Sequence, residues 1–338
     1  MIKNKNILIT GGTGSFGKYF AKTLLEKFSP NKVIIFSRDE QKQFSMQTDI
    51  IFKKYKKKLR FFVGDIRDEA RLTDAMNGVD IVVHAAALKI IDTAEYNPME
   101  FIKTNIMGSQ NVVTSALKNN VKKVVALSTD KATSPINLYG ATKLCAEKLF
   151  VSSNNYRGTK KTSFSVVRYG NVMGSRGSVI PFFLKIKNSK VFTVTDKDMT
   201  RFNMTLDESA SFVMNCINKM AGGEVFIPKL PSYKILDVVK AIELKNKIKF
   251  IGRRPGEKIH EEMVSNSDAH NTYEYKNYFI IYSDSLVNEN LLIKIKKDLK
   301  KRLCKKTSFD FNYSSDQNKK FLTINELRNL INKHVEKI

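Results

Sequence analysis

Residues 6–17 read NILITGGTGSFG, in which a short apolar strand runs into glycines at positions 11, 14 and 17. A helical pattern follows through Lys27. Glycines between a strand and a helix form a tight turn that lets the backbone approach a pyrophosphate, and the helix N-terminus favours the negative charge. Because this pattern follows the first strand and opens a helix, it predicts a dinucleotide-binding fold.

Further strands and helices alternate after this first unit. Apolar strand patterns lie at residues 32–36, 60–66, 80–84, 124–128 and 164–172, and a helical pattern covers residues 99–119. The alternation predicts an α/β fold with a Rossmann-type, doubly wound parallel sheet. The pattern changes after residue 172. We therefore expect a dinucleotide-binding domain at residues 1–172 and a smaller C-terminal α/β substrate-binding lobe at residues 173–338, interleaved with the first.

Composition and charge argue against several classes of protein. The chain of 338 residues has a net charge of +25, with 58 Lys and Arg against 33 Asp and Glu spread along its length. No basic region carries interleaved aromatics, which argues against a nucleic-acid partner. The three cysteines lie far apart and predict neither a metal site nor a disulfide framework. We find no signal peptide or transmembrane run and expect a cytoplasmic protein without membrane insertion.

The end of the second predicted strand bears on which dinucleotide is bound. There the chain reads Ser37-Arg38-Asp39. Arginine suits the 2′-phosphate of NADP, whereas a carboxylate suits the ribose of NAD. Ser37 and Arg38 thus favour NADP, although Asp39 could turn toward the ribose. Asp65, after the third strand, is expected near the adenine or at a helix cap.

The stretch STDKATSPINLYGATK, residues 128–143, carries the candidate chemistry. Tyr139 and Lys143 are four residues apart on a predicted helix, so their side chains share one face. We expect the Lys143 ammonium to lower the pKa of Tyr139 from its usual value of about 10. Tyr139 could then take a proton from a sugar hydroxyl. An amphipathic helix with one Tyr and one Lys is the structural alternative.

Three arginines after residue 172 are candidates for binding an anionic substrate. Arg176, Arg201 and Arg254 lie near predicted turns. Arginine can bind a diphosphate through two parallel hydrogen bonds. Each arginine alone is more often a surface cation, but three in one half of the chain favour substrate binding there.

These motifs together resemble a known family. The glycine pattern with Tyr139-x-x-x-Lys143 resembles the extended short-chain dehydrogenase/reductase superfamily. Thr129-Asp130-Lys131 resembles the UDP-N-acetylglucosamine 4,6-dehydratases within it, in particular the C5-inverting type of the pseudaminic acid pathway. The resemblance covers almost the whole chain. It implies a lyase of polysaccharide biosynthesis that holds NADP, takes a UDP-sugar and forms a homo-oligomer, either a dimer or a hexamer.

The resemblance implies a role for each residue of the motifs. Tyr139, supported by Lys143, would remove the proton of the C4 hydroxyl. Lys131 would be the base at C5, and Asp130 the acid that helps the C6 hydroxyl leave. Thr129 would hydrogen-bond near C4. The remaining cofactor-binding positions would be Gly11, Thr13, Gly14, Ser15, Phe16, Gly17, Ser37, Arg38, Asp39, Lys42, Asp65, Ile66, Ala85, Ala86, Ala87, Asn105, Tyr169 and Val172. The substrate-binding positions would be Lys89, Asn171, Arg176, Val179, Arg201, Arg254 and Glu257.

Two departures from the family and three alternatives stay open. Ile90-Ile91-Asp92 stands where the family usually has His or Gln followed by Val-Pro, and Asn203 replaces a common aromatic. Both changes bear on sugar selectivity. The alternatives are a nucleotide-sugar 4-epimerase, a dehydratase of a related UDP-sugar, and a non-catalytic NADP-binding regulator. An epimerase needs no group to expel the C6 hydroxyl, so Asp130 and Lys131 argue against it.

Overall fold

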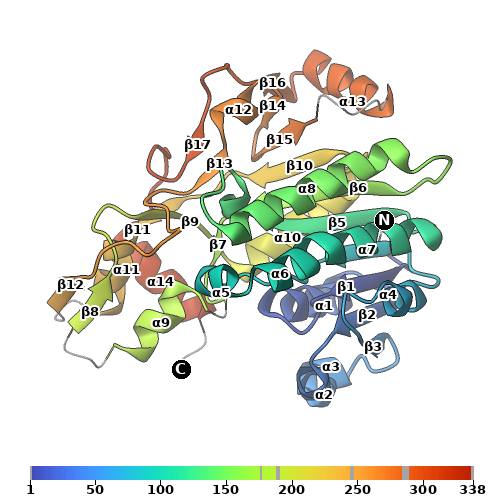
Figure 1. The fold of residues 1–338 in the computed structure, drawn as a ribbon, viewed down its shortest axis with the longest axis horizontal. Helices are drawn as coiled ribbons and strands as arrows, with labels where there is room; N and C mark the ends of the chain where they lie inside the picture. The colour runs from blue at the N-terminus through green and yellow to red at the C-terminus, as the bar shows by residue number, and fades with distance from the viewer. Residues whose placement is uncertain (1, 176, 188–190, 244–246, 284–288, 336–338) are drawn as a thin grey trace.

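A ten-stranded sheet forms the centre of the computed structural model, which describes residues 2–175, 177–187, 191–243, 247–283 and 289–335 (Figure 1). The strand order is β16-β14-β15-β10-β6-β5-β4-β1-β2-β3. The bounds are β1 Asn6–Thr10, β2 Lys32–Ser37, β3 Leu59–Val63, β4 Ile81–His84, β5 Lys123–Thr129, β6 Ser163–Tyr169, β10 Glu224–Pro228, β14 Thr272–Tyr275, β15 Tyr278–Tyr282 and β16 Cys304–Lys306.

Seven of these strands, from β3 to β10, are paired in parallel. Strands β1, β2, β4 and β5 are almost wholly buried runs of Val, Ile and Leu, as expected for a sheet covered on both faces. The sheet order reverses beside β1, whose neighbours are β2 and β4. In a doubly wound sheet, this reversal creates the crevice where a ligand binds.

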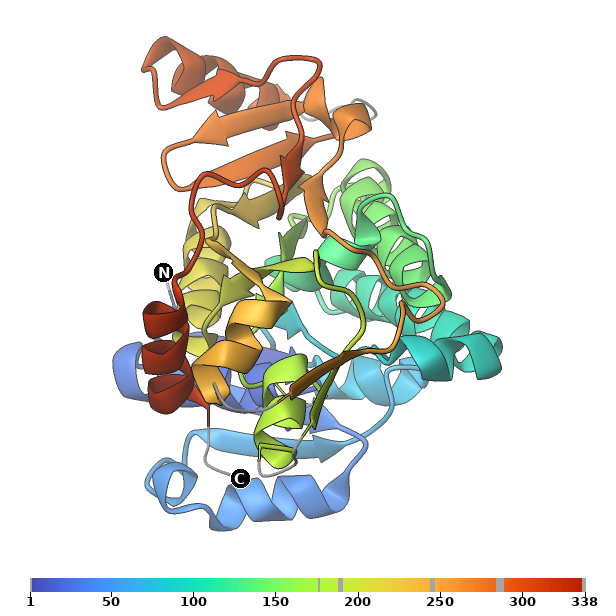
Figure 2. The same cartoon turned by 90° about the vertical axis from the view of Figure 1, so that its left-hand side faces the viewer.

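Helices cover both faces of the parallel strands (Figure 2). On one face α4, α7 and α8 pack side by side, and on the other α1 packs against α10. The bounds are α1 Ser15–Lys27, α2 Glu40–Thr48, α3 Ile50–Lys53, α4 Glu69–Ala75, α5 Ile91–Tyr96, α6 Pro98–Phe101, η1 Ile102–Met107, α7 Gly108–Lys118, η2 Asp130–Ala132, α8 Leu138–Tyr156 and α10 Leu206–Lys219.

The C-terminal half contributes to the main sheet and also builds smaller units. Strands β15, β14 and β16 extend the main sheet in antiparallel fashion beyond β10. A second apolar core lies among β8, α9, α11 and α14, at the left of Figure 1. The remaining bounds are β7 Asn171–Val172, α9 Val179–Lys185, β8 Val191–Val194, β9 Thr200–Met204, β11 Ser232–Lys234, α11 Ile235–Ile242, β12 Lys247–Phe250, β13 Glu262–Val264, α12 Asn266–Ala269, α13 Glu289–Lys300, β17 Tyr313–Ser314 and α14 Ile324–His334.

The predicted strands of the dinucleotide-binding half are confirmed, with boundaries that differ by one or a few residues. The single helix expected at residues 99–119 is interrupted, because η1 is a π-helical turn between α6 and α7. Such turns often occur at functional sites. This one carries Asn105, which is buried.

Candidate active site

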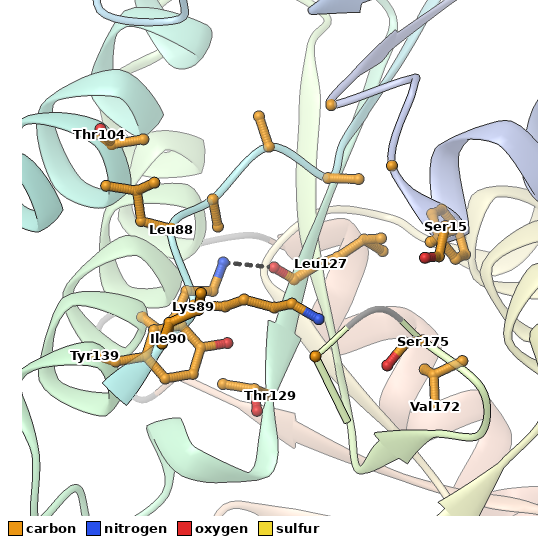
Figure 3. A pocket seen from close by; sticks show the side chains of 18 of the residues that line it. Ser15, Leu88, Lys89, Ile90, Thr104, Leu127, Thr129, Tyr139, Val172 and Ser175 are labelled. Carbon is orange, nitrogen blue, oxygen red and sulfur yellow. Dashed lines mark hydrogen bonds between the residues drawn. The ribbon is translucent and has the colours of Figure 1, made fainter. Parts of the chain in front are cut away.

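A cavity of about 860 Å³ opens at the carboxyl ends of the parallel strands. It extends from the glycine-rich turn after β1, past the loop after β4, to the ends of β5 and β6. Figure 3 shows this loop with Leu88 and Lys89 above Tyr139 and Thr129. The cavity therefore occupies the crevice that the sheet order predicts.

The glycine-rich turn has the geometry that a phosphate group requires. Gly11 has φ of +65°, and a Cβ atom there would collide with the backbone of Ala85 and Ala86. Gly14 precedes α1 and supplies no side chain to cap it. The N-terminus of α1 therefore borders the cavity, where a helix start favours a bound anion.

Most residues predicted to bind a cofactor line this cavity. They are Gly11, Thr13, Gly14, Ser15, Phe16, Gly17, Ser37, Arg38, Asp39, Lys42, Asp65, Ile66, Ala85, Ala86, Ala87, Tyr139, Lys143, Tyr169 and Val172.

Asn105 is the exception among the predicted cofactor residues, because it does not line the cavity. Its side-chain amide donates to the carbonyl of Leu88 at 2.9 Å and to Thr142 Oγ1 at 3.0 Å. Its Oδ1 accepts from the N–H of Leu88 at 2.9 Å. Asn105 therefore fixes the loop after β4 against α8 and supports the cavity wall indirectly.

Asp39 after β2 and Asp65 after β3 both accept hydrogen bonds from neighbouring protein groups. Asp39 accepts the N–H of Lys42 at 2.9 Å as the N-cap of α2 and also pairs with the Lys42 ammonium. Asp65 accepts two hydrogen bonds from the Arg67 guanidinium, at 2.7 and 3.0 Å. Arg38 lies 3.6 Å from Asp65 and is about half exposed at the cavity edge. Arg38, at the cavity edge, therefore has fewer protein contacts than the Asp39 and Asp65 carboxylates and is the better placed of the three to contact a ligand.

The residues of the 128–143 stretch meet at the inner end of the cavity. Thr129 ends β5, Asp130 and Lys131 form the short helix η2, and Tyr139 lies in the first turn of α8. Gly140 allows this packing, because a Cβ atom there would collide with the carbonyl oxygen of Lys131. The Tyr139 hydroxyl lies near Thr129 (Figure 3), whose own hydroxyl donates to Asp130 Oδ1 at 2.9 Å.

The expected lowering of the Tyr139 pKa is wrong. Burial raises the pKa of Tyr139 to about 12, although the Lys131 charge and the nearby Thr129 hydroxyl oppose the rise. Lys143 instead donates to the carbonyl of Leu127 at 2.8 Å (Figure 3). Burial lowers the pKa of Lys143 to about 8. Desolvation therefore outweighs the attraction that spacing on a helix predicts.

Asp130 and Lys131 belong to a buried charge cluster. The Lys131 ammonium lies 3.2 Å from Asp130 Oδ1 and 2.8 Å from Glu261 Oε1. Burial raises the pKa of Asp130 against the opposing effect of Lys131. Burial alone would lower the pKa of Lys131, but Asp130 and Glu261 raise it above its usual value. The sequence analysis missed Glu261, which lies 130 residues away in the chain.

The residues predicted to bind the substrate divide into three groups. Lys89, Asn171, Arg254 and Glu257 line the cavity, whereas Val179 and Arg201 do not. Arg201 is buried and donates to the carbonyl oxygens of Thr200, Lys258 and Ile259. These bonds fix Arg201 beside the cavity lining, and its role in substrate binding stays a prediction. Arg176 lies outside the described residues.

The residues that depart from the family pattern also have defined places. Ile90, Ile91 and Asp92 line the cavity mouth, and Asp92 lies 3.8 Å from Arg254. Asn203 is buried on β9 opposite Asn171 of β7.

Several buried polar atoms on the cavity wall lack a protein partner. These atoms are Thr104 Oγ1, Ser128 Oγ, Asp130 Oδ2, Asn171 Oδ1 and Ser178 Oγ. Buried polar groups are normally hydrogen-bonded. A polar ligand in this cavity would supply the missing partners.

Behind the cavity, a buried arginine joins four segments. Arg168 forms two hydrogen bonds with the Glu147 carboxylate, at 2.6 and 3.0 Å. It also donates to Thr133 Oγ1 and to the carbonyl of Met263, both at 2.9 Å. The segment after η2 is thereby held against α8, β6 and β13.

Replacing Arg168 with methionine should destabilise the protein by about 3–5 kcal/mol, because it leaves the Glu147 carboxylate buried without its partner. The midpoint of urea unfolding measures this loss. Lys118→Met is the matched control, since it removes the cation of an exposed pair with Glu69, where the expected change is about 1 kcal/mol or less. Equal shifts in the two variants would contradict a structural role for Arg168.

Neither a metal site nor a membrane-spanning helix is found in the part of the chain that the structure describes. No cluster of three or more His, Cys, Asp or Glu side chains could hold a metal ion there. Nor does any helix within the described ranges have the length and apolar character needed to cross a bilayer.

Comparisons with known proteins agree with this geometry. A family model described as "Polysaccharide biosynthesis protein" matches residues 7–283. The chain is 52% identical over 339 residues, 99% of both chains, to the "UDP-N-acetylglucosamine 4,6-dehydratase (inverting)" of Campylobacter jejuni subsp. jejuni serotype O:23/36 (strain 81-176). It is 43% identical over 292 residues, 84% of both chains, to a "UDP-glucose 4-epimerase" of Rickettsia canadensis (strain McKiel). The X-ray structure of Pen from Bacillus thuringiensis matches with a TM-score of 0.86 and 40% identity, covering 98% of each chain.

Proposed function

The chain belongs to the polysaccharide biosynthesis protein family of extended short-chain dehydrogenases/reductases, and from this premise we propose that it is a UDP-N-acetylglucosamine 4,6-dehydratase that inverts C5. The observation that carries the proposal is the meeting of Asp130, Lys131 and Tyr139 at one end of a cavity of about 860 Å³. The 52% identity over 99% of both chains to the inverting dehydratase of Campylobacter jejuni supports it.

We propose NADP as the cofactor. The uncapped N-terminus of α1 and the close approach of Gly11 to the loop after β4 fit a dinucleotide pyrophosphate. Arg38 suits a 2′-phosphate, and Asp39 is already used as a helix cap. When bound, the nicotinamide would accept a hydride from C4 of the sugar and return it to C6.

Replacing Arg38 with alanine should weaken NADP binding about 10- to 100-fold and change NAD binding much less. The loss corresponds to one charged hydrogen bond, about 1.5–3 kcal/mol. Isothermal titration with each dinucleotide measures both affinities. Arg60→Ala, on the neighbouring strand β3, removes a cation that does not line the cavity and should leave both unchanged. Equal weakening of NAD and NADP in Arg38→Ala would argue against the 2′-phosphate contact.

The protein's own side chains would move the protons of the reaction. Tyr139, which lines the cavity, would take the proton of the C4 hydroxyl. The resulting ketone acidifies the proton at C5, which Lys131 would remove as an amine. Asp130, whose raised pKa favours the carboxylic acid, would protonate the departing C6 hydroxyl. As hydride returns to C6, C5 would take up a proton, which offsets the proton that Lys131 removed. The proton taken from the C4 hydroxyl offsets the one that leaves in water.

The substrate would lie in the same cavity, beside the proposed cofactor. We propose that Lys89, Asn171, Arg254 and Glu257 bind it, with Arg254 at the diphosphate. We also propose that residues 1–172 hold the cofactor while residues 173–338 mainly hold the sugar nucleotide. From the family resemblance, we propose that the protein is a homo-oligomer of the cytoplasm.

A nucleotide-sugar 4-epimerase is the second candidate, supported by the 43% identity to the Rickettsia canadensis relative. Proton NMR of the purified protein with UDP-N-acetylglucosamine in D₂O separates the two. A dehydratase produces a new C6 methyl signal and deuterium at C5, and the coupling of the C5 position reports inversion. Accumulation of the C4 epimer without a methyl signal would refute dehydration. No change with added NADP would favour a non-catalytic NADP-binding regulator.

A further inference from the structure

Glu261 is a buried carboxylate beside the cavity that the proposed reaction does not use. Its side chain is 2% exposed and does not line the cavity, whereas Lys131 does. Glu261 Oε1 accepts a hydrogen bond from the Lys131 ammonium at 2.8 Å. Glu261 Oε2 has no hydrogen-bond partner. The side chain therefore reaches the cavity by direct contact with Lys131, and its charge also raises the pKa of Asp130 and of Tyr139.

The surroundings hold Glu261 in this position from two sides. Its backbone N–H donates to Ser315 Oγ at 2.9 Å, and its carbonyl accepts from the N–H of Ser315 at 2.8 Å. Arg201 Nε lies 3.6 Å from Glu261 Oε1. Burial disfavours the carboxylate, but the charges of Lys131 and Arg201 hold the pKa of Glu261 below its usual value. Glu261 is thus a fixed negative charge against the Lys131 ammonium.

Several other titratable or charged groups face Lys131 from the elements around it. They are Asp130 on η2, Arg201 on β9, Lys258 before β13, Lys89 after β4, Tyr139 on α8 and Tyr233 on β11. Asp130 is the one carboxylate among these six groups, and Glu261 is the second carboxylate beside Lys131. Lys131 Nζ lies closer to Glu261, at 2.8 Å, than to Asp130, at 3.2 Å.

We infer that Glu261 is a positioning residue that holds the Lys131 ammonium against Asp130 and sets the pH at which Lys131 releases its proton. When Lys131 gives its proton to the Asp130 carboxylate, the pair becomes an amine and a carboxylic acid, with no change in total charge. These are the two forms that removal of the C5 proton and departure of the C6 hydroxyl require. The negative charge of Glu261 stabilises the Lys131 ammonium and so opposes this transfer. It therefore controls the fraction of molecules in which Lys131 is an amine and Asp130 a carboxylic acid. This consequence for the rate rests on the proposed function, whereas the control of Lys131 itself does not.

Glu261→Gln tests the inference because glutamine keeps the size and an oxygen acceptor but removes the charge. The probe is acetic anhydride, which labels free amines, with Lys131 labelling followed by peptide mass spectrometry across a pH series. We expect the midpoint of Lys131 labelling to fall by about one to three pH units, the usual effect of an opposite charge at this distance. Glu262→Gln is the matched control, since Glu262 bonds to Ser134 and Asn312, and its midpoint should equal that of the wild type.

An unchanged midpoint in Glu261→Gln, or an equal shift in Glu262→Gln, would overturn the inference. If Glu261→Gln does not fold, Glu261→Asp replaces it, because it moves the charge away from Lys131 and should produce a smaller shift in the same direction. The pH profile of methyl formation provides the second readout, and its Lys131-dependent limb should move with the labelling midpoint. If the wild type forms no methyl product but the Lys131 labelling midpoint shifts in Glu261→Gln, the proposed function is refuted and the inference stands. Methyl formation without a labelling shift would refute the inference alone.

Discussion

Asp130→Asn should lower the rate of methyl formation from UDP-N-acetylglucosamine about 10²- to 10⁴-fold, the usual contribution of a general acid. Asp130 lines the cavity, is buried and has one oxygen, Oδ2, without a protein partner. Burial raises its pKa, so the carboxyl group can hold a proton for the departing hydroxyl. Asparagine has nearly the same shape but has no acidic proton to give.

The same variant should still exchange the C5 proton. In Asp130→Asn, Lys131 can still release its proton to solvent, because loss of the Asp130 charge removes one of the causes that raise the pKa of Lys131. The substrate recovered from D₂O should therefore contain deuterium at C5 without a methyl signal. Asp74→Asn, on the exposed side of α4, makes the same chemical change away from the cavity and should leave the rate unchanged. A methyl signal at the wild-type rate in Asp130→Asn would show that another group protonates the C6 hydroxyl.

Tyr139→Phe should lower both methyl formation and C5 exchange, again by about 10²- to 10⁴-fold. Phenylalanine keeps the ring that packs against Ala94 and Phe101 but removes the hydroxyl that would accept the proton. Without removal of the C4 hydroxyl proton, no ketone forms to acidify C5. Loss of both signals therefore distinguishes Tyr139→Phe from Asp130→Asn, and retention of C5 exchange would contradict the role of Tyr139.

The raised pKa of Tyr139 also predicts the direction of a pH effect. At a pKa of about 12 the hydroxyl is protonated at neutral pH, so the phenolate fraction increases about tenfold with each pH unit below that value. The wild-type rate of C5 exchange should therefore rise with pH. The residual rate of Tyr139→Phe should lose the part of this dependence that Tyr139 contributes and rise less steeply with pH, because only the Lys131-dependent part remains. An identical slope in the two proteins would assign the pH effect to another group.

Local sequence patterns predicted the fold because they describe short-range physics. The alternation of buried apolar strands with helices required a parallel sheet, and the glycines at 11, 14 and 17 required a tight turn before α1. The position of Arg38 at the end of β2 follows in the same way. The family resemblance added the catalytic roles of Asp130, Lys131 and Tyr139. These residues lie close together in the chain and also in the structure.

The local patterns failed where distant segments decide the environment. The spacing of Tyr139 and Lys143 on α8 correctly put them on one helix face, but the neighbouring strand β5 provides the carbonyl of Leu127 that Lys143 binds. Arg201 looked like an exposed cation in a turn, whereas the carbonyl oxygens of residues 258 and 259 surround it. Neither partner is close in sequence to the residue it binds.

The sequence by itself determined the strands β1 to β6 of the main sheet, the position of its crevice and the residue types at the inner end of that crevice, but not β10 or the antiparallel strands β14, β15 and β16. Only the tertiary structure decided the charge state of those residues, because a pKa depends on burial and on every charge within a few ångströms. Glu261 illustrates this, since it reaches Lys131 across 130 residues of chain, and no pattern around either residue connects them. Packing of the C-terminal segment against η2 brings the two charges together.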